Sequence, residues 1–317
     1  MHRVDATAYL APYAPRRVRR PVAIRLTDDT YPLEPSPEQA WLPIAFRAFA
    51  ALAAESRVED LLILGTGNGL DVLGAAEIFP DLRCVVATDL HPACVEVARE
   101  NVRANLADER AGVACEFHAG HLLEPVARQR RFNLVYENLP NLPAPAPAKR
   151  ELRRGTIGGR FYDASGLDVP EPFGAYLLAL HHRCLRDARS RLRAGGGVLT
   201  ALGGRVPLEV AFDLHRTCGY VPRLVAFDVK LQVEAELVVP AYREAEARDG
   251  VQLTFYAAEA IALVASARAA GLEGGALAAA VAPDLDRLAM SATQAEMRVG
   301  RGEPVAHSVL MICGRRP

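Results

Sequence analysis

One short segment constrains this chain more than any other: an apolar run that leads into a turn with three glycines. In LLILGTGNGLDVLGAA the glycines stand at positions 65, 67 and 69, and a helical pattern follows at once. Glycine adopts positive φ and lets a ligand approach the backbone, and a helix N-terminus offers free amide groups. The third glycine comes one residue earlier than in the dinucleotide fingerprint G-x-G-x-x-G, which argues against a pyrophosphate ligand. The turn Gly65-Thr66-Gly67-Asn68-Gly69 therefore favours a nucleoside without phosphates.

The pattern around this turn indicates the fold. From Asp60 to about Gln232, short apolar runs alternate with amphipathic stretches, which is typical of βαβ units. We expect an α/β fold with a doubly wound, mostly parallel, seven-stranded sheet, whose last strand is HSVLMICGRR near the C-terminus. Ligands on such sheets gather at the carboxyl ends of the strands.

Four segments are expected along the 317 residues. They are a proline-rich arm and helix (1–58), the sheet domain (59–232), an alanine-rich helical insertion (233–303) and the final strand returning to the sheet (304–317). The insertion is a candidate lid or the interface of a possible homodimer. The loop from Pro143 to Pro172 is long for a compact domain, as functional lids often are.

The composition limits the kinds of binding partner that the chain is expected to have. Lys and Arg number 37 against 38 Asp and Glu, so the net charge of -1 speaks against a nucleic-acid or membrane surface. The basic runs at 16–20 and 128–131 suggest solvated turns, with a patch for an anionic substrate as the alternative. The six cysteines are scattered without metal-ligand spacing, so we expect no metal and a reducing cytoplasm. No apolar run reaches the ~20 residues of a membrane span.

A second polar element stands at the end of the next strand-like run. Asp89 closes CVVATD, 20 residues after Gly69. Its two carboxylate oxygens can accept hydrogen bonds from both hydroxyls of a ribose. The alternative is an N-cap for the helix starting at Pro92, which Asp89 precedes by too many residues. Asp89 therefore predicts a nucleoside site beside the glycine turn.

These elements, with a fourth strand ending in Asn-Leu-Pro-Asn, resemble the class I (Rossmann-like) S-adenosylmethionine (SAM)-dependent methyltransferases. The resemblance covers about residues 60 to 232 and the final strand. It implies SAM as cofactor, with Gly65 to Gly69 beneath the methionine and ribose and Asp89 on the ribose hydroxyls.

Two positions depart from that family pattern. Ile63 stands where an acid two residues before the first glycine is usual, and Gly120-His121 stands where an Asp often accepts from the adenine amino group. Asp71 is the candidate partner of the methionine amino group. His121 or a backbone carbonyl is the candidate partner of the adenine, and the alternative for His121 is a solvated loop residue. Leu90 is a further candidate contact to the cofactor.

The run FNLVYENLPNLP places Asn138, Leu139, Pro140 and Asn141 at the carboxyl edge. This segment resembles the Asn-Pro-Pro-Tyr motif of amino-group methyltransferases, most closely the glutamine methyltransferases of release factors and ribosomal proteins. The resemblance implies that the Asn138 side-chain oxygen and the carbonyl after it hold the nucleophilic nitrogen. Leu139 and Asn141 replace the first proline and the aromatic residue, and Pro140 and Asn141 are candidate substrate contacts.

Two residues before this motif are further candidates for catalysis. Glu137 is a candidate general base or partner of a cationic substrate. Tyr136 is a candidate phenol, with a packing aromatic as the alternative. Strand alternation points Glu137 away from Tyr136 and Asn138, so at most some of the three face one site.

The sequence thus favours an enzyme that moves a methyl group from SAM to a nitrogen, or less readily an oxygen or carbon, of a small molecule enclosed by the arm and the insertion. The alternatives are a glutamine-type protein substrate, a nucleic-acid base, or a non-catalytic SAM-fold binding module. The net charge and Asn141 in place of an aromatic residue speak against nucleic acid.

Overall fold

The computed structural model describes residues 2–28, 30, 33–34, 37, 40–107, 112–142 and 166–317. Most of the predicted lid loop, residues 143–165, therefore lies outside the described residues. The chain forms two compact units. Unit 1 comprises Met1–Asn138, Arg186–Thr200 and Gly314–Pro317, and unit 2 comprises Leu139–Leu185 and Ala201–Cys313.

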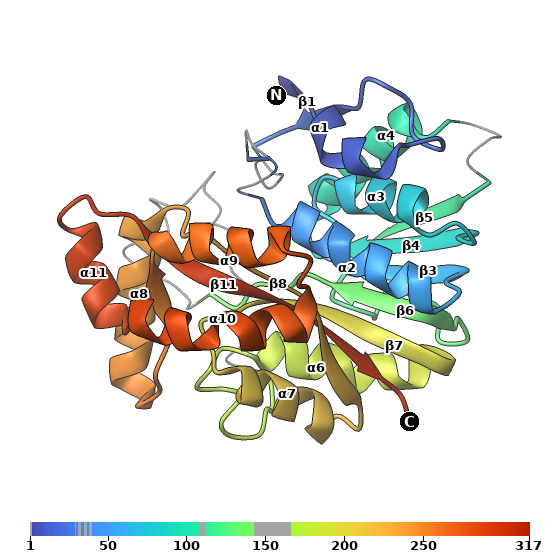
Figure 1. The fold of residues 1–317 in the computed structure, drawn as a ribbon. Coiled ribbons are helices and arrows are strands. Elements are labelled where there is room, and N and C mark those ends of the chain that lie inside the picture. The colour runs from blue at the N-terminus through green and yellow to red at the C-terminus, as the bar shows by residue number, and fades with distance from the viewer. Residues whose placement is uncertain are drawn as a thin grey trace. The chain divides into compact units, whose positions relative to one another are not determined.

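Unit 1 is built on a parallel sheet (Figure 1). Its strands lie in the order β7-β6-β3-β4-β5. They are β3 (Asp60–Leu64), β4 (Cys84–Asp89), β5 (Ala114–Ala119), β6 (Phe132–Glu137) and β7 (Leu192–Gly203), whose last three residues belong to unit 2. In the central strand β3 every residue after Asp60 is buried. The unbroken apolar run thus has the composition that a strand covered on both faces requires.

Three helices of unit 1 run beside one another along this sheet (Figure 1). They are α2 (Leu42–Glu55), α3 (Leu70–Ile78) and α4 (Pro92–Asn105). Gly74 lies where α3 meets α2, and a Cβ there would come within 2.1 Å of the Phe46 ring. Phe46 and Phe49 are fully buried, and the ring of Phe49 lies 5.3 Å from that of Phe79. Glycine therefore sets how closely the two helices approach.

The N-terminal arm consists of β1 (His2–Asp5), α1 (Thr7–Leu10), the 3-10 turn η1 (Ala11–Tyr13) and β2 (Ala23–Leu26). β1 and β2 form an antiparallel two-stranded sheet. Between them, the Glu77 carboxylate of α3 accepts hydrogen bonds from the amides of Arg16, Arg17 and Val18 at 2.6, 2.7 and 3.1 Å. The Arg17 guanidinium donates to the carbonyls of Ala76 and Phe79, both at 3.0 Å. The arm thereby satisfies carbonyls that the end of α3 leaves unpaired.

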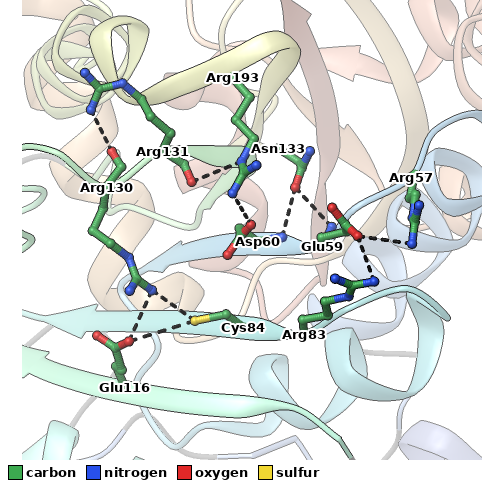
Figure 2. A network of polar contacts seen from close by, with 10 residues as sticks. All are labelled: Arg57, Glu59, Asp60, Arg83, Cys84, Glu116, Arg130, Arg131, Asn133 and Arg193. Carbon is green, nitrogen blue, oxygen red and sulfur yellow. Dashed lines mark hydrogen bonds and ion pairs between the residues drawn. The ribbon is translucent and has the colours of Figure 1, made fainter.

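A network of polar side chains closes the amino-terminal edge of the same sheet (Figure 2). The Asn133 side-chain oxygen accepts from the amides of Glu59 and Asp60 at 3.0 and 2.9 Å, which ties the start of β6 to the start of β3. Arg193 pairs with Asp60 at 2.5 Å, and Arg130 pairs with Glu116 at 3.1 Å. Such exposed ion pairs contribute little individually, so the amide bonds made by Asn133 fix this edge more firmly.

In unit 2 the long strand β11 (Val305–Arg315), whose last two residues belong to unit 1, pairs with β8 (Val221–Leu231) and is antiparallel to β9 (Phe255–Ala257). The short strand β10 (Ala289–Met290) extends β9. Every residue of β11 from Val305 to Gly314 is buried. The helices are α6 (Ala179–Ala188), which ends in unit 1, α7 (Leu208–Thr217), α8 (Ala235–Asp249), α9 (Glu259–Ala269), α10 (Gly274–Leu288) and α11 (Ala292–Val299). Helices α9 and α10 lie against β8, and α8 packs on α11 (Figure 1).

The predicted α/β fold with a mostly parallel sheet is confirmed, and the seven predicted strands are β3 to β8 and β11. Within the described residues the structure adds β1, β2, β9 and β10. The Gln232 amide donates to the Val305 carbonyl at 2.9 Å, so the two ends of the segment between them, which belongs to unit 2, lie next to each other. None of the helices in the described part combines the length and apolar character that a bilayer crossing needs.

Candidate functional site

The carboxyl ends of three neighbouring strands of unit 1 bring the predicted cofactor residues together. β3 lies between β4 and β6, with Leu64 opposite Thr88 on one side and Glu137 on the other. The glycine turn follows Leu64, Asp89 follows Thr88, and Asn138 follows Glu137. The Asn138 amide donates to the Leu64 carbonyl at 3.3 Å. Turn, acid and asparagine therefore share one edge of the sheet.

All three glycines of the turn have positive φ, and Gly67 and Gly69 differ in what surrounds them. Gly69 has a φ of 83°, and a Cβ there would lie 3.0 Å from the Cα of Ala98 on α4. Gly67 has a φ of 57°, and a Cβ there would meet no atom within 4 Å. Both residues adopt the left-handed conformation that glycine alone takes without strain. Gly67 also presents bare backbone to open space, which fits a ligand that packs against the turn.

Asp89 joins the end of β4 to this turn. Its Oδ2 accepts a hydrogen bond from the Gly67 amide, and its Oδ1 accepts one from the His91 amide, both at 3.0 Å. His91 is the N-cap residue of α4 and has no side-chain cap, so Asp89 does not fill the alternative capping role. A carboxylate offers about four acceptor positions. After these two bonds Asp89 retains capacity for two ribose hydroxyls.

Asp71 lies buried at the start of α3, behind the turn. The Thr66 hydroxyl donates to its Oδ1 at 2.7 Å, and the Val72 amide donates to the same oxygen at 2.8 Å. Burial raises the pKa of Asp71 to about 7, against the opposing effect of these hydrogen bonds. A carboxyl group with this pKa gains charge when a cation approaches. Asp71 therefore has the chemistry required of a partner for an ammonium group.

The last residues of β6 differ in their surroundings. Tyr136 is 1% exposed, and its ring packs edge-on against that of Phe49 at a centroid distance of 5.0 Å. Burial raises the pKa of Tyr136 well above its usual value, so the phenol stays protonated at neutral pH. Glu137 is fully buried, whereas Asn138 is partly exposed at the strand end. Of these three candidates, Asn138 is the one that a substrate can reach.

Leu90 directly follows Asp89, and His121 follows the end of β5. The Gly120 amide donates to the Asp89 carbonyl at 2.9 Å, which holds the ends of β4 and β5 together. The His121 Nδ1 lies 3.5 Å from Oε1 of Glu124. Leu90 is 43% exposed, one of the few large apolar side chains in the described residues with that exposure. Their positions fit the predicted contacts to a base.

Pro140 and Asn141 belong to unit 2, because the chain leaves unit 1 after Asn138. Pro140 is exposed, whereas Asn141 is 7% exposed. The Asn141 Nδ2 donates to the Gly203 carbonyl at 3.0 Å, and the Tyr242 hydroxyl donates to the Asn141 carbonyl at 3.0 Å. Asn141 therefore anchors the end of the motif within unit 2.

The sequence analysis missed one residue that touches the turn. Asn101 on α4 is 2% exposed, and its Nδ2 donates to the Asn68 carbonyl at 2.9 Å. A signal was present, because Asn101 and Asn105 repeat at helical spacing on the face that carries buried Val97 and Ala98. Buried amides at such positions require partners, which in this case are backbone groups from other segments.

No family model matches this chain. Comparison with known proteins nevertheless finds proteins of similar sequence. The chain is 33% identical over 201 residues to a release factor glutamine methyltransferase of Deinococcus radiodurans. That match covers 62% of this chain and 63% of the relative, so the chain spans less than two thirds of it. A ribosomal protein L11 methyltransferase of Rhizobium rhizogenes is 38% identical over 88 residues, 27% of this chain and 28% of that protein.

Among solved structures, a Thermus thermophilus 16S rRNA methyltransferase is 15% identical with a TM-score of 0.40, covering 61% of this chain and 40% of the other. The strand order of unit 1, the glycine turn and the relatives by sequence together identify the fold as that of the class I SAM-dependent methyltransferases.

The comparisons overturn the predicted partners. The sequence analysis expects a small-molecule acceptor and argues against nucleic acid, whereas the relatives by sequence are named for macromolecular substrates. The predicted partners are therefore wrong. The net charge of -1 sums over the whole surface, so it does not exclude a local surface that recognises a macromolecule.

Proposed function

We propose that this chain is a SAM-dependent methyltransferase whose acceptor is a side-chain nitrogen of a protein, of the glutamine amide type. The observation that carries the proposal is the Asp89 carboxylate, which is bonded to the Gly67 amide at 3.0 Å, beside the glycine turn that separates Asp89 from the strand end bearing Asn138. The likeness to a release factor glutamine methyltransferase supports the choice of acceptor.

The residues of unit 1 fit SAM along its length. The open face of Gly67 receives the ligand against bare backbone, and Asp89 accepts from the ribose hydroxyls. Leu90 and His121 flank the adenine. Asp71 faces the methionine ammonium in place of the acid that Ile63 does not supply, and Thr66 orients its carboxyl group.

The chemistry is an in-line displacement, for which SAM supplies a methyl group on a positively charged sulfur. When SAM is bound, the acceptor nitrogen would take the methyl carbon, the neutral thioether would be the leaving group, and water would accept the proton that the nitrogen loses. Asn138 contributes by positioning: its side-chain oxygen and the carbonyl after it accept the two N–H groups of an amide, which leaves the lone pair facing the methyl group. Such positioning can supply ~7–11 kcal/mol of the barrier.

The test combines binding with transfer. Titration calorimetry should detect SAM binding to the wild-type chain. Incubation with methyl-labelled SAM and ribosome or release-factor fractions, followed by mass spectrometry, should place the label on a glutamine side chain. Asn138→Ala is the matched variant and should bind SAM but fail to transfer.

Two results would contradict the proposal. Undetectable SAM binding would refute the enzyme assignment and leave a SAM-shaped scaffold without the cofactor. Label that appears in RNA or in small metabolites, with none on protein, would refute the acceptor while preserving the enzyme assignment.

A further inference from the structure

Among the residues that the structure describes, the Asn101 side chain contacts both the N-terminal arm and the glycine turn. We propose that Asn101 couples the two, so that docking of the arm and binding of SAM stabilise one another. The inference rests on the proposed SAM site and adds to it a segment that lies outside the sheet.

The attachment of the arm to α4 is an unusual ladder between a strand and a helix. The Arg25 amide donates to the Asn101 Oδ1 at 2.8 Å, and the Asn101 Nδ2 donates to the Arg25 carbonyl at 2.9 Å. Asn105 repeats the pattern with Ala23, at 2.9 and 3.0 Å. Each carboxamide thus bonds both the amide and the carbonyl of one residue of β2, as the backbone of a neighbouring strand would.

The spacing explains why this ladder fits. Two residues of a strand advance about 6.7 Å, and four residues of a helix advance about 6 Å. Positions 23 and 25 of the arm therefore meet positions 105 and 101 of the helix, respectively, almost in register. Both asparagines are at most 3% exposed, so these bonds are shielded from water.

The two asparagines differ in their remaining contact. The Asn101 Nδ2 also donates to the Asn68 carbonyl, at 2.9 Å, between the two glycines that shape the turn. The Asn105 Nδ2 instead donates to the Asn101 carbonyl within α4, at 2.8 Å. Asn101 alone of this pair touches both arm and turn, which makes Asn105 its matched control.

The bond from Asn101 bears on the proposed cofactor site directly. It fixes the peptide after Asn68, while the Gly67 amide before it is held by Asp89. On the same side, the backbone of Gly69 packs against Ala98, one helical turn before Asn101. Any ligand that requires this turn conformation also favours the state in which Asn101, and with it the arm, is docked.

The arm has attachments that do not involve the turn. The Arg19 amide donates to the Asn105 carbonyl at 2.7 Å, and Glu77 and Arg17 hold the arm at the far end of α3. Removing the Asn101 side chain should therefore disconnect the arm from the turn without releasing the arm altogether.

The experiment is hydrogen–deuterium exchange of the arm amides at residues 22–26, with and without SAM, beside calorimetric SAM titration. In wild type, SAM should slow exchange of the arm. In Asn101→Ala, SAM should bind roughly tenfold more weakly, within the usual range of couplings between sites, and should no longer protect the arm. In Asn105→Ala, the arm should exchange faster without SAM yet still respond to it.

The outcomes separate this inference from the proposed function. SAM that binds wild type without slowing arm exchange would overturn the coupling alone, as would equal weakening by Asn101→Ala and Asn105→Ala. No SAM binding to wild type would overturn the proposed function and the coupling together. The wild-type measurement needs no substitution, so poor folding of a variant does not leave the question open.

Discussion

Asp89 connects the end of β4 to the backbone of the glycine turn, which is the proposed cofactor site. Asp89→Ala should weaken SAM binding roughly 10- to 100-fold, because a hydrogen bond to a charged group contributes about 1.5–3 kcal/mol. Calorimetric titration measures this change. Asp81→Ala is the control, because Asp81 precedes the same strand and is exposed, with a 3.4 Å pair to Arg57. Equal affinity of wild type and Asp89→Ala would refute the ribose assignment.

Asp71 makes the proposed binding of SAM depend on pH. Its pKa of about 7, raised by burial, leaves much of it protonated below neutrality in the free protein. An ammonium ligand favours the carboxylate, so binding lowers this pKa and releases a proton. SAM affinity should therefore rise from pH 5 to about 7 and level off above. Calorimetry in two buffers of different ionisation enthalpy counts the released proton.

The control for Asp71 is Asp71→Asn, which keeps the shape of the side chain and an acceptor for the Thr66 hydroxyl. This variant should show a flat pH profile and no proton release. If it released the same number of protons as wild type, the titrating group would lie elsewhere in the site.

At the scale of elements, the contact between α2 and α3 depends on Gly74. Gly74→Ala should lower the melting temperature, because its Cβ would lie 2.1 Å from the Phe46 ring and overpacking costs about 1–3 kcal/mol. Alanine in a helix is otherwise the better residue by roughly 1 kcal/mol. Gly275→Ala, where the nearest atom is 3.9 Å away, should therefore be neutral or stabilising. A melting temperature unchanged by Gly74→Ala would show that the helices move apart.

The sequence was sufficient to predict the strands and helices in which apolar residues recur at a regular spacing. The apolar runs of β3, β4 and β6 and the amphipathic pattern of α4 correspond to elements of the structure. The missed strands are short: β9 has three residues and β10 two, inside a segment whose alanine content favours helix. Such strands are specified by pairing with a distant strand, which periodicity within a window does not register.

The residues of the candidate site also fall into those that local sequence predicts and those that it does not. The glycine turn and Asp89 could be predicted, because strand, turn and acid lie close along the chain and meet at one sheet edge. Asn141 was placed with a substrate by motif resemblance, whereas its amide bonds the Gly203 carbonyl 62 residues away. Asn101 was missed for a related reason, because its partners come from the arm and the turn. Local sequence patterns do not predict contacts between segments that are distant along the chain.

At the scale of the whole molecule, the chain passes from one compact unit to the other after residues 138, 185, 200 and 313. Neither unit is therefore one continuous segment. The four predicted segments divide the chain by sequence alone and remain predictions. Strand β11 illustrates the difference, because it is the last element of the chain and a central strand of unit 2.

The fragment 59–232, predicted as the SAM domain, should not fold as the full chain does. It lacks β11, which is buried from Val305 to Gly314 and pairs with β8, and it lacks the arm. Thermal melting followed by circular dichroism should show a cooperative transition for the full chain and a broad one for the fragment. A sharp transition with native-like spectrum in the fragment would contradict this expectation.

The hydrogen bond between Gln232 and Val305 has a consequence for how this protein can vary. The two ends of the intervening segment meet there, but the segment also supplies β9 and β10 to the sheet and lays α9 and α10 against β8. The entropic cost of closing a loop grows only slowly with its length. Evolution or engineering can therefore change the loops between these elements most easily, whereas exchange of the whole segment would require a new partner for β11.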